Sequence, residues 1–435
     1  MKYSVPWGAE EKLEFDLPKG WEVIQIVKPK LKPAAKNVTR EIERALKQPI
    51  GSKKLSEMVD RGKKIAIVVE DISRPTPTHL ILPYILDEIF EGGAEPENVT
   101  IVFALGVHRP MTEAEMEKKA GKEVLDKVNA INHNCEDEDN LTYLGKTSHG
   151  TPVYVNKTVA DADIKVLIGT IEPHVQAGFG GGFKNILPGV AGIETIAINH
   201  KLVATPRHFN AVGFMPEDDP MRLDLEEAGE MAGPEFFIVN AVLNEKTEIV
   251  KIFAGDPIEA HREGIKLAEE MYGVEVPKQA DIVITDSYPM DIDFRQGFKC
   301  ILNTMFGARD GGTLIPILRC MEGVGSVKIP EQVPSAEDMR DLAEHIPDDE
   351  ILGLAETLKM PVEEQFGLYI HFKLIRRNKL IVYAPTIPKG LTASLGSPPI
   401  RSIDEAIDKA KDVYGEKADI LIFPAGGVTY PILQK

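Results

Sequence analysis

The strongest constraint on the fold comes from three short apolar runs that are rich in valine and isoleucine. Their sequences are KIAIVVE, TIVFALG and IKVLIGT, and they end at Glu70, Gly106 and Thr170. Because apolar residues occupy both faces of each run, we expect strands of a parallel sheet that helices cover on both sides. Helical patterns lie between the runs, and Thr112 with Glu115 forms a capping-box pattern in one of them. Strands that alternate with helices predict βαβ units.

The same alternation restarts near residue 280, where the run DIVITDS begins a second series. The runs GTLIPILR, KLIVYAP and ADILIFP follow it, with helical segments between them. A chain of 435 residues also has room for more than one domain of the usual size, about 100–200 residues. We therefore expect two α/β domains with largely parallel sheets, residues 1–265 and residues 266–435, and an active site in the cleft between them.

Charge and cysteine content exclude several classes of protein. The chain has 50 basic and 68 acidic residues, a formal net charge of −18, which repels nucleic acid and anionic membranes. No apolar run reaches the roughly 18 residues that a membrane span needs, and the N-terminus lacks the apolar segment of a signal peptide. The three cysteines, Cys135, Cys300 and Cys320, form no C-x-x-C pair. We expect reduced thiols, a cytoplasmic location, and neither a nucleic acid nor a membrane as partner.

Ionisable residues follow each of the first three predicted strands. Sites in open α/β sheets form beyond the carboxyl ends of the strands, so the loops at residues 71–78, 107–111 and 171–189 are expected to converge. In the first loop, Asp71 and Arg74 form a D-x-x-R pattern. Arg74 is a candidate to bind a carboxylate through two hydrogen bonds, and Asp71 to orient a neighbouring side chain. A local ion pair or a turn cap is the alternative for both.

The third loop combines glycines with a lysine. Gly180, Gly181 and Gly182 allow the backbone to approach a ligand closely, although a sharp turn between a strand and a helix explains them equally well. The sequence around Lys184 is not a Walker A motif, because neither serine nor threonine follows it. Lys184 is a candidate phosphate ligand, Schiff-base lysine or anchoring amine, and a solvated surface lysine is the alternative.

Three of the ten histidines occupy positions that favour chemistry. His108 and His174 each follow a predicted strand, and His200 lies shortly after the glycine loop. The other seven have polar or helical surroundings that favour surface or packing roles: His79, His133, His149, His208, His261, His345 and His371.

In the second half, the segment DFRQGFKC places Arg295, Gln296 and Lys299 after another predicted strand. A helix that begins near Asp293 would put Arg295 and Lys299 on one face. An ordinary exposed helix start is the alternative.

Taken together, these residues resemble the nickel-dependent lactate racemase family over essentially the whole chain. The matching motifs occur in the family's order and are D-x-x-R at Asp71 and Arg74, G-x-H-R at residues 106–109, E-P-H at residues 172–174, G-G-x-K at residues 181–184, N-H at Asn199 and His200, and Q-x-x-K at Gln296 and Lys299. The resemblance implies a racemase or epimerase that removes hydrogen from C2 of a 2-hydroxy acid as hydride and returns it to the opposite face.

The resemblance also implies a cofactor, the nickel-pincer nucleotide. This pyridinium-type mononucleotide holds nickel through one carbon and two sulfurs, and separate enzymes synthesise it. By the match, Lys184 anchors the cofactor covalently and His200 is the protein's nickel ligand. Asp71 and the glycines at residues 180–182 are assigned to the cofactor site. A single histidine suffices as metal ligand only because the cofactor supplies the other donors.

The remaining matched residues are assigned to the substrate. His108 and His174 are the implied acid/base pair, which suits histidine because its pKa lies near neutrality. Arg74, Gln296 and Lys299 are the implied ligands of the substrate carboxylate.

The chain departs from the family at the substrate end. Arg295 stands where a tyrosine is expected, and no tryptophan follows Trp21, so the expected pocket tryptophan is absent. Arg295 is therefore a further candidate substrate ligand, and the substrate is lactate-like, malate-like or a sugar acid. Two other functions stay open: a non-catalytic binding or carrier protein for the pincer nucleotide, and a Schiff-base enzyme that acts through Lys184.

Overall fold

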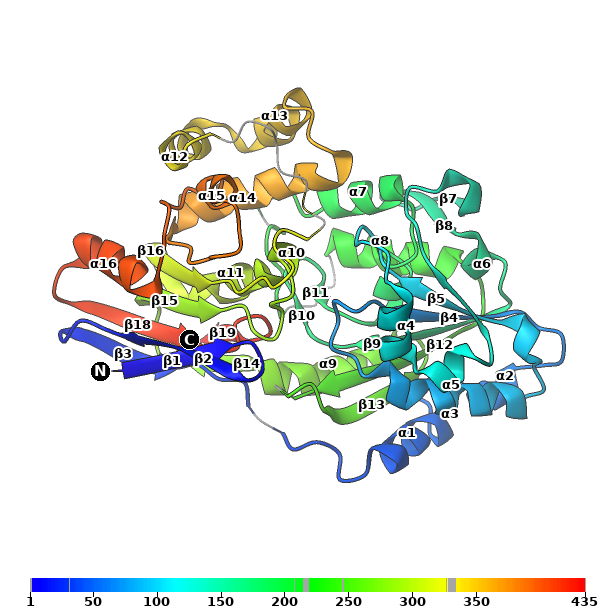
Figure 1. Cartoon of the computed structure of the whole chain (residues 1–435). Coiled ribbons are helices and arrows are strands. Elements are labelled where there is room, and N and C mark those ends of the chain that lie inside the picture. The colour runs from blue at the N-terminus through cyan, green and yellow to red at the C-terminus, as the bar shows by residue number, and fades with distance from the viewer. Residues whose placement is uncertain are drawn as a thin grey trace.

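The molecule is built around two separate sheets with helices on both sides of each (Figure 1). It is a computed structural model, and it describes residues 2–30, 32–206, 208–213, 219–244, 246–325, 327 and 334–434. This architecture confirms the expected class, two α/β units with largely parallel sheets.

The first sheet has six strands. Their order across the sheet is β13 (Ile249–Gly255), β12 (Phe236–Leu243), β9 (Ile164–Thr170), β4 (Ile65–Glu70), β5 (Val99–Ala104) and β6 (Asn129–Asn132). Only the outer pair, β12 and β13, is antiparallel. Along β4, Ile65, Ile67 and Val69 face one apolar core, while Ala66 and Val68 face another. Both faces of the strand are therefore buried, as the unbroken apolar run predicted.

The second sheet has five strands, all parallel to their neighbours. Their order is β17 (Lys379–Leu380), β16 (Ala308–Ile317), β15 (Ala280–Asp286), β18 (Ala418–Phe423) and β3 (Trp21–Ile26). Of the run KLIVYAP, only the first two residues form a strand, because residues 381–384 continue alongside β16 as irregular backbone.

The N-terminal segment belongs to the second sheet, whereas the sequence had placed residues 1–265 together in the first domain. Strand β3 pairs with β18, and the hairpin of β1 (Lys2–Trp7) and β2 (Glu11–Asp16) precedes it. Val5 and Phe15 of this hairpin share a core with Ile284 and Ile420 of the second sheet. The hairpin buries its apolar face in this core, which is the physical reason that the N-terminal segment joins the second sheet and not the first.

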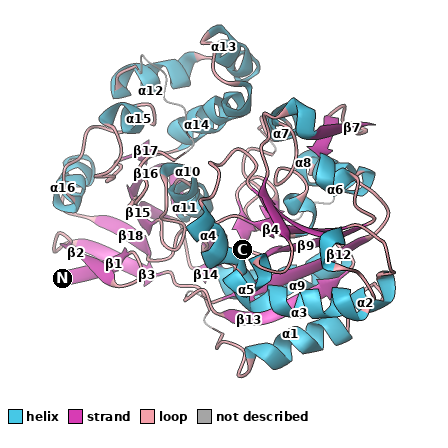
Figure 2. Cartoon of the chain, turned by 45° about the vertical axis from the view of Figure 1, so that its right-hand side comes forward, coloured by secondary structure: helices cyan, strands magenta, loops and turns pink. Residues whose placement is uncertain are grey.

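Helices cover both sheets, as Figure 2 shows. Around the first sheet lie α1 (Val38–Lys47), α2 (Leu55–Met58), α3 (Thr78–Glu91), α4 (Glu113–Ala120), α5 (Lys122–Leu125), α6 (Lys157–Ala160), α7 (Ile193–Lys201), α8 (Pro220–Met231) and α9 (Glu259–Tyr272). Around the second lie α10 (Phe294–Gly297), α11 (Lys299–Thr304), α12 (Ala336–His345), α13 (Ile351–Thr357), α14 (Gln365–Arg377), α15 (Lys389–Ala393) and α16 (Ile403–Tyr414). The predicted capping box at Thr112 and Glu115 is present at the start of α4.

Smaller elements complete the chain. Two are hairpins, β7 (Leu141–Lys146) with β8 (Pro152–Asn156) and β10 (Pro173–His174) with β11 (Gly178–Phe179). A parallel pair is formed by β14 (Gly273–Val276) and β19 (Tyr430–Leu433). Of the short 3-10 helices, η3 (Gly182–Asn185) and η6 (Val362–Glu364) lie near the site. Helix α7 packs against η6 and α14, so elements of the two sheets meet above the strands' carboxyl ends (Figure 1). In the described ranges, no helix has both the length and the apolar character to cross a membrane.

Candidate active site

A cavity lies where the loops after β4, β5 and β9 meet residues of α10, α11 and η6. Eleven of the twelve site residues predicted from the sequence line this cavity. They are Asp71, Arg74, His108, His174, Gly180, Gly181, Lys184, His200, Arg295, Gln296 and Lys299. The remaining predicted residue, Gly182, does not line the cavity. Its backbone N–H instead donates to the Asn240 side chain at 2.8 Å, which holds the glycine loop on strand β12.

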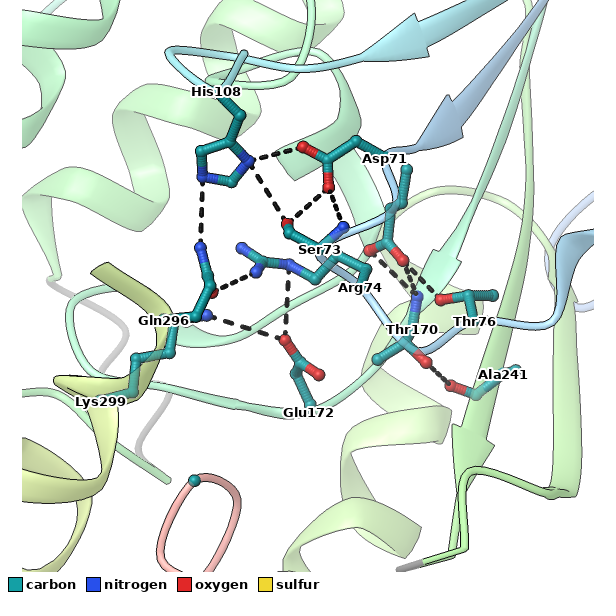
Figure 3. Close-up of polar contacts among 12 residues, drawn as sticks. Asp71, Ser73, Arg74, Thr76, His108, Thr170, Glu172, Ala241, Gln296 and Lys299 are labelled. Atoms are coloured by element: carbon teal, nitrogen blue, oxygen red, sulfur yellow. Dashed lines mark hydrogen bonds and ion pairs between the residues drawn. The ribbon is translucent and has the colours of Figure 1, made fainter. Parts of the chain in front are cut away.

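His108 contacts the Asp71 carboxylate through one ring nitrogen and Gln296 through the other (Figure 3). Its Nδ1 lies 2.5 Å from Asp71 Oδ2, and Ser73 donates to the other Asp71 oxygen through both Oγ, at 2.5 Å, and its backbone N–H, at 2.9 Å. A carboxylate only accepts hydrogen bonds, so the contact with Asp71 favours the tautomer of His108 that has its proton on Nδ1 and a lone pair on Nε2. The Gln296 amide lies 3.2 Å from that Nε2.

Asp71 stays ionised in this arrangement. Burial by itself would raise the pKa of Asp71, but His108, Arg74 and Ser73 outweigh burial and hold the pKa well below its ordinary value. The position therefore carries a full negative charge that fixes one tautomer of His108. The family resemblance assigned Asp71 to the cofactor site, whereas its hydrogen bonds in the structure are to His108 and Ser73. This arrangement fits the other prediction for Asp71, that it orients a neighbouring side chain.

Cationic side chains gather opposite His108 around the buried Glu172. Arg74 Nε lies 3.6 Å and Lys299 Nζ 3.9 Å from Glu172 Oε1, and Arg74 donates to Gln296 Oε1 at 2.5 Å (Figure 3). Arg74 lies in the loop after β4 of the first sheet, and Lys299 begins α11 beside the second sheet, so the two parts of the molecule contribute jointly to the cluster.

Lys299 lacks a hydrogen-bond partner for its buried ammonium group. Burial and the neighbouring Arg74 lower the pKa of Lys299 to about 7, against the opposing effect of Glu172. An unsatisfied buried donor is costly, and an anion in the cavity would satisfy it. This is the strongest indication in the described residues that the cavity takes a carboxylate.

His174 presents the opposite hydrogen-bonding state. Its Nδ1 accepts the backbone N–H groups of Gln176 and Ala177 at 3.3 and 3.2 Å, so the proton of the neutral ring sits on Nε2. Burial, with Lys184 and Lys299 nearby, lowers the pKa of His174 well below its ordinary value. Nε2 of His174 is therefore a hydrogen-bond donor, whereas Nε2 of His108 is an acceptor in the tautomer that Asp71 favours.

Lys184 lies on η3, directly after the glycine loop. Burial, followed by the charges of Arg222 and Arg74, lowers the pKa of Lys184 well below its ordinary value. The neutral amine is the nucleophilic form, which both an anchoring lysine and a Schiff-base lysine require.

His200 lies on α7 with one ring nitrogen committed to the helix. Its Nδ1 donates to the Ile196 carbonyl at 2.8 Å, which leaves the Nε2 lone pair available. Burial and Lys184 lower the pKa of His200 to about 3, so the ring is neutral, as a metal ligand must be. In the part of the chain that the structure describes, no group of three or more histidine, cysteine or acidic side chains could hold a metal ion. A metal at His200 would thus need other donors.

Several residues at the site were not predicted. Glu172 stood in a quoted motif without a role, although its place after a strand could have singled it out. Lys119 reaches the site from α4, where its Nζ donates to the carbonyls of Arg74 and Thr76 at 2.8 and 3.1 Å. Glu363 lines the cavity from η6, and no strand-end signal marks it in the sequence.

The helix expected from Asp293 onward is interrupted. Asp293 caps α10, but α10 ends at Gly297 and α11 begins at Lys299. Arg295 forms an ion pair with Glu364, while Lys299 faces Glu172. The two cations therefore serve different parts of the cavity instead of sharing one helix face.

Two family models match the chain. The model described as the lactate racemase N-terminal domain matches residues 8–211, and the model described as the lactate racemase C-terminal domain matches residues 276–429. Together they span most of the described structure, including both sets of residues that line the cavity.

Individual proteins give the same result. The lactate racemase of Thermoanaerobacterium thermosaccharolyticum is 31% identical over 428 residues, with 97% of each chain covered. The lactate racemase of Lactiplantibacillus plantarum is 28% identical over 389 residues, with 88% of this chain and 89% of that one covered. The structure of the former protein's apoprotein has a TM-score of 0.83 at 29% identity, covering all of both chains. A Thermotoga maritima protein has a TM-score of 0.68 at 19% identity, over 93% of this chain, which bears on the fold alone.

Proposed function

The chain belongs to the lactate racemase family and is an isomerase, and we propose that it inverts C2 of a 2-hydroxy acid through removal and return of hydride. The observation that carries the proposal is the pairing of two imidazoles, whose Nδ1 atoms have opposite hydrogen-bonding partners, with a buried ammonium group that lacks a hydrogen-bond partner in the same cavity. A hydroxyl and a carboxylate on adjacent carbons need this combination.

The substrate carboxylate binds between Arg74 and Lys299. Its charge satisfies the Lys299 ammonium group and favours the protonated form of that lysine. Gln296 already bridges Arg74 and His108, which sets the distance between the carboxylate and the base. Holding the carboxylate keeps the oxidised intermediate in place while its carbonyl group turns from one face to the other.

The two histidines handle the hydroxyl proton. His108 Nε2 has a lone pair and accepts the proton, and Asp71 stabilises the imidazolium ring that results. His174 Nε2 carries a proton and donates a hydrogen bond to the oxygen from the other side. When hydride returns to C2, the proton held by His108 goes back to the oxygen, so both rings end the reaction as they began it.

The residues fit the nickel-pincer nucleotide that the family resemblance implies. Lys184 would anchor it through the neutral amine, and His200 Nε2 would bind the nickel, because the fixed Nδ1–H leaves that atom as ligand. When bound, the cofactor supplies the hydride acceptor that these side chains lack. His261 donates to the Gly180 carbonyl at 2.7 Å and steadies the glycine loop beside it.

Intact mass spectrometry and a chiral assay test the proposal together. Protein produced with the cofactor-synthesis enzymes should carry a covalent adduct and racemise or epimerise a 2-hydroxy acid. Lys184→Ala should lose the adduct and the activity, whereas Lys201→Ala, a lysine outside the cavity that pairs with Glu356, should keep both. An unmodified mass in the loaded wild type would refute the anchoring role.

The lowered pKa of Lys184 also suits a Schiff-base lysine, and one further assay separates the two functions. Borohydride in the presence of a 2-keto acid fixes an imine as a stable secondary amine. We expect no such product; its formation at Lys184 would favour the Schiff-base enzyme.

A further inference from the structure

The active-site cavity continues past His108 into a second groove. The two hollows share five lining residues, Gly106, Val107, His108, Arg295 and Glu363, so they meet beside the base. The groove has a volume of about 340 Å³, enough for several carbon atoms beyond the reacting centre.

Among the carboxylate, guanidinium and ammonium groups that line this groove, carboxylates predominate. Glu363 and Glu364 come from η6, and Glu136 comes from the segment after β6. Arg295 is the one arginine or lysine among the groove's lining residues, and it forms an ion pair with Glu364 in which both side chains are largely buried. The positive charge of Arg295 is therefore already balanced by Glu364, and Glu363 and Glu136 add two further carboxylates to the lining of the groove.

This charge pattern excludes a second carboxylate as the preferred occupant. A carboxylate beside Arg295 would displace or face Glu364 and Glu363, and like charges at close range repel. Hydroxyl groups are different, because each both donates and accepts hydrogen bonds. The carboxylates of Glu363 and Glu364 can accept hydrogen bonds from substrate hydroxyl groups, and the N–H groups of Arg295 can donate hydrogen bonds to the hydroxyl oxygens. The groove can therefore satisfy both the donors and the acceptors of a hydroxylated chain.

We propose that the groove binds the hydroxylated tail of the substrate, and that the preferred substrate is a polyhydroxy acid of the sugar-acid class. This inference rests on the proposed function, because it takes C2 of the acid to lie between His108 and His174. The carboxylate lies at Arg74 and Lys299, and the tail extends past His108 toward Arg295, Glu363 and Glu364.

Steady-state kinetics of the cofactor-loaded enzyme test the proposal. The probes are gluconate for the polyhydroxy class, lactate for no tail, malate for an anionic tail and 4-amino-2-hydroxybutanoate for a cationic tail. We expect kcat/KM for gluconate to exceed the other three at least about tenfold, the worth of one hydrogen bond to a charged group. If kcat/KM for lactate, malate or 4-amino-2-hydroxybutanoate exceeds that for gluconate, the proposed substrate class is wrong while the proposed function stands. Failure to invert any of the four overturns both.

Glu364→Gln locates the effect in the groove. It removes the charge that balances Arg295, so the ratio of kcat/KM for malate to that for gluconate should rise about tenfold or more. The matched control is Glu344→Gln, an exposed change on α12 away from the cavity, which should leave the ratio unchanged. An unchanged ratio in Glu364→Gln, with a wild-type melting temperature, would contradict the proposed role of the ion pair.

Discussion

Replacing Asp71 with asparagine isolates the contribution of one buried charge to the base. The carboxylate is 3% exposed, lies 2.5 Å from His108 Nδ1, and accepts two hydrogen bonds from Ser73. Asparagine keeps the shape and one acceptor oxygen but loses the charge that stabilises a protonated His108. The fold should therefore persist while the base weakens.

The size of the effect follows from the type of contact. A hydrogen bond to a charged group contributes about 1.5–3 kcal/mol. If that amount is lost only when His108 is protonated, kcat falls about 10- to 150-fold. KM should change little, because Arg74 and Lys299 keep their positions. The equilibrium constant belongs to the substrate, so kcat/KM must fall by the same factor in both directions.

Chiral chromatography of initial rates from each stereoisomer measures these quantities. Asp126→Asn, an exposed carboxylate at the end of α5, provides the matched control. A kcat for Asp71→Asn within about twofold of wild type, with the same melting temperature, would refute the argument that Asp71 supports His108.

Three further predictions concern groups outside this pair. Lys119→Met removes the donor to the carbonyls of Arg74 and Thr76, so we expect KM to rise about tenfold and kcat to change less; an unchanged KM would deny Lys119 a positioning role. Lys299 binds the carboxylate as a cation, and its pKa is about 7, so KM should rise as pH increases through 7 in wild type and stay flat in Lys299→Met. Burial lowers the pKa of His133 to about 4, so the unfolded chain takes up a proton there at a higher pH than the folded chain does. Stability should therefore fall as pH drops from 6.5 to 4, by up to about 3 kcal/mol from this group, and denaturant unfolding of His133→Gln should show a smaller loss.

The strand ends explain how much of the site could be predicted. Apolar runs fixed β4, β5 and β9 closely, and parallel strands point their carboxyl ends to one edge. Residues directly after those strands, such as Asp71, His108 and His174, therefore had to lie near one another. Their roles in catalysis remain predictions.

Contacts from distant segments could not be predicted in the same way. The residue pattern of Trp21–Ile26 does not indicate which strand this segment pairs with, so the sequence did not predict that β3 joins the second sheet. Lys119 lies on a helix whose surface pattern looks ordinary, and only the fold directs its amine to the Arg74 loop. The ion pair of Arg295 and Glu364 joins residues 69 positions apart. The sequence pattern around Arg295 therefore could not show that a carboxylate balances its charge.

The fate of the C2 hydrogen tests the proposed reaction most directly. The cofactor-loaded enzyme is given a 2-hydroxy acid carrying deuterium at C2 in ordinary water, and the inverted product is analysed by NMR. Hydride removal and return within one closed cavity predicts that deuterium stays at C2 of the product. Loss of the label to solvent at the rate of inversion would indicate proton abstraction instead, and would contradict the assignment of His108 and His174 to the hydroxyl proton.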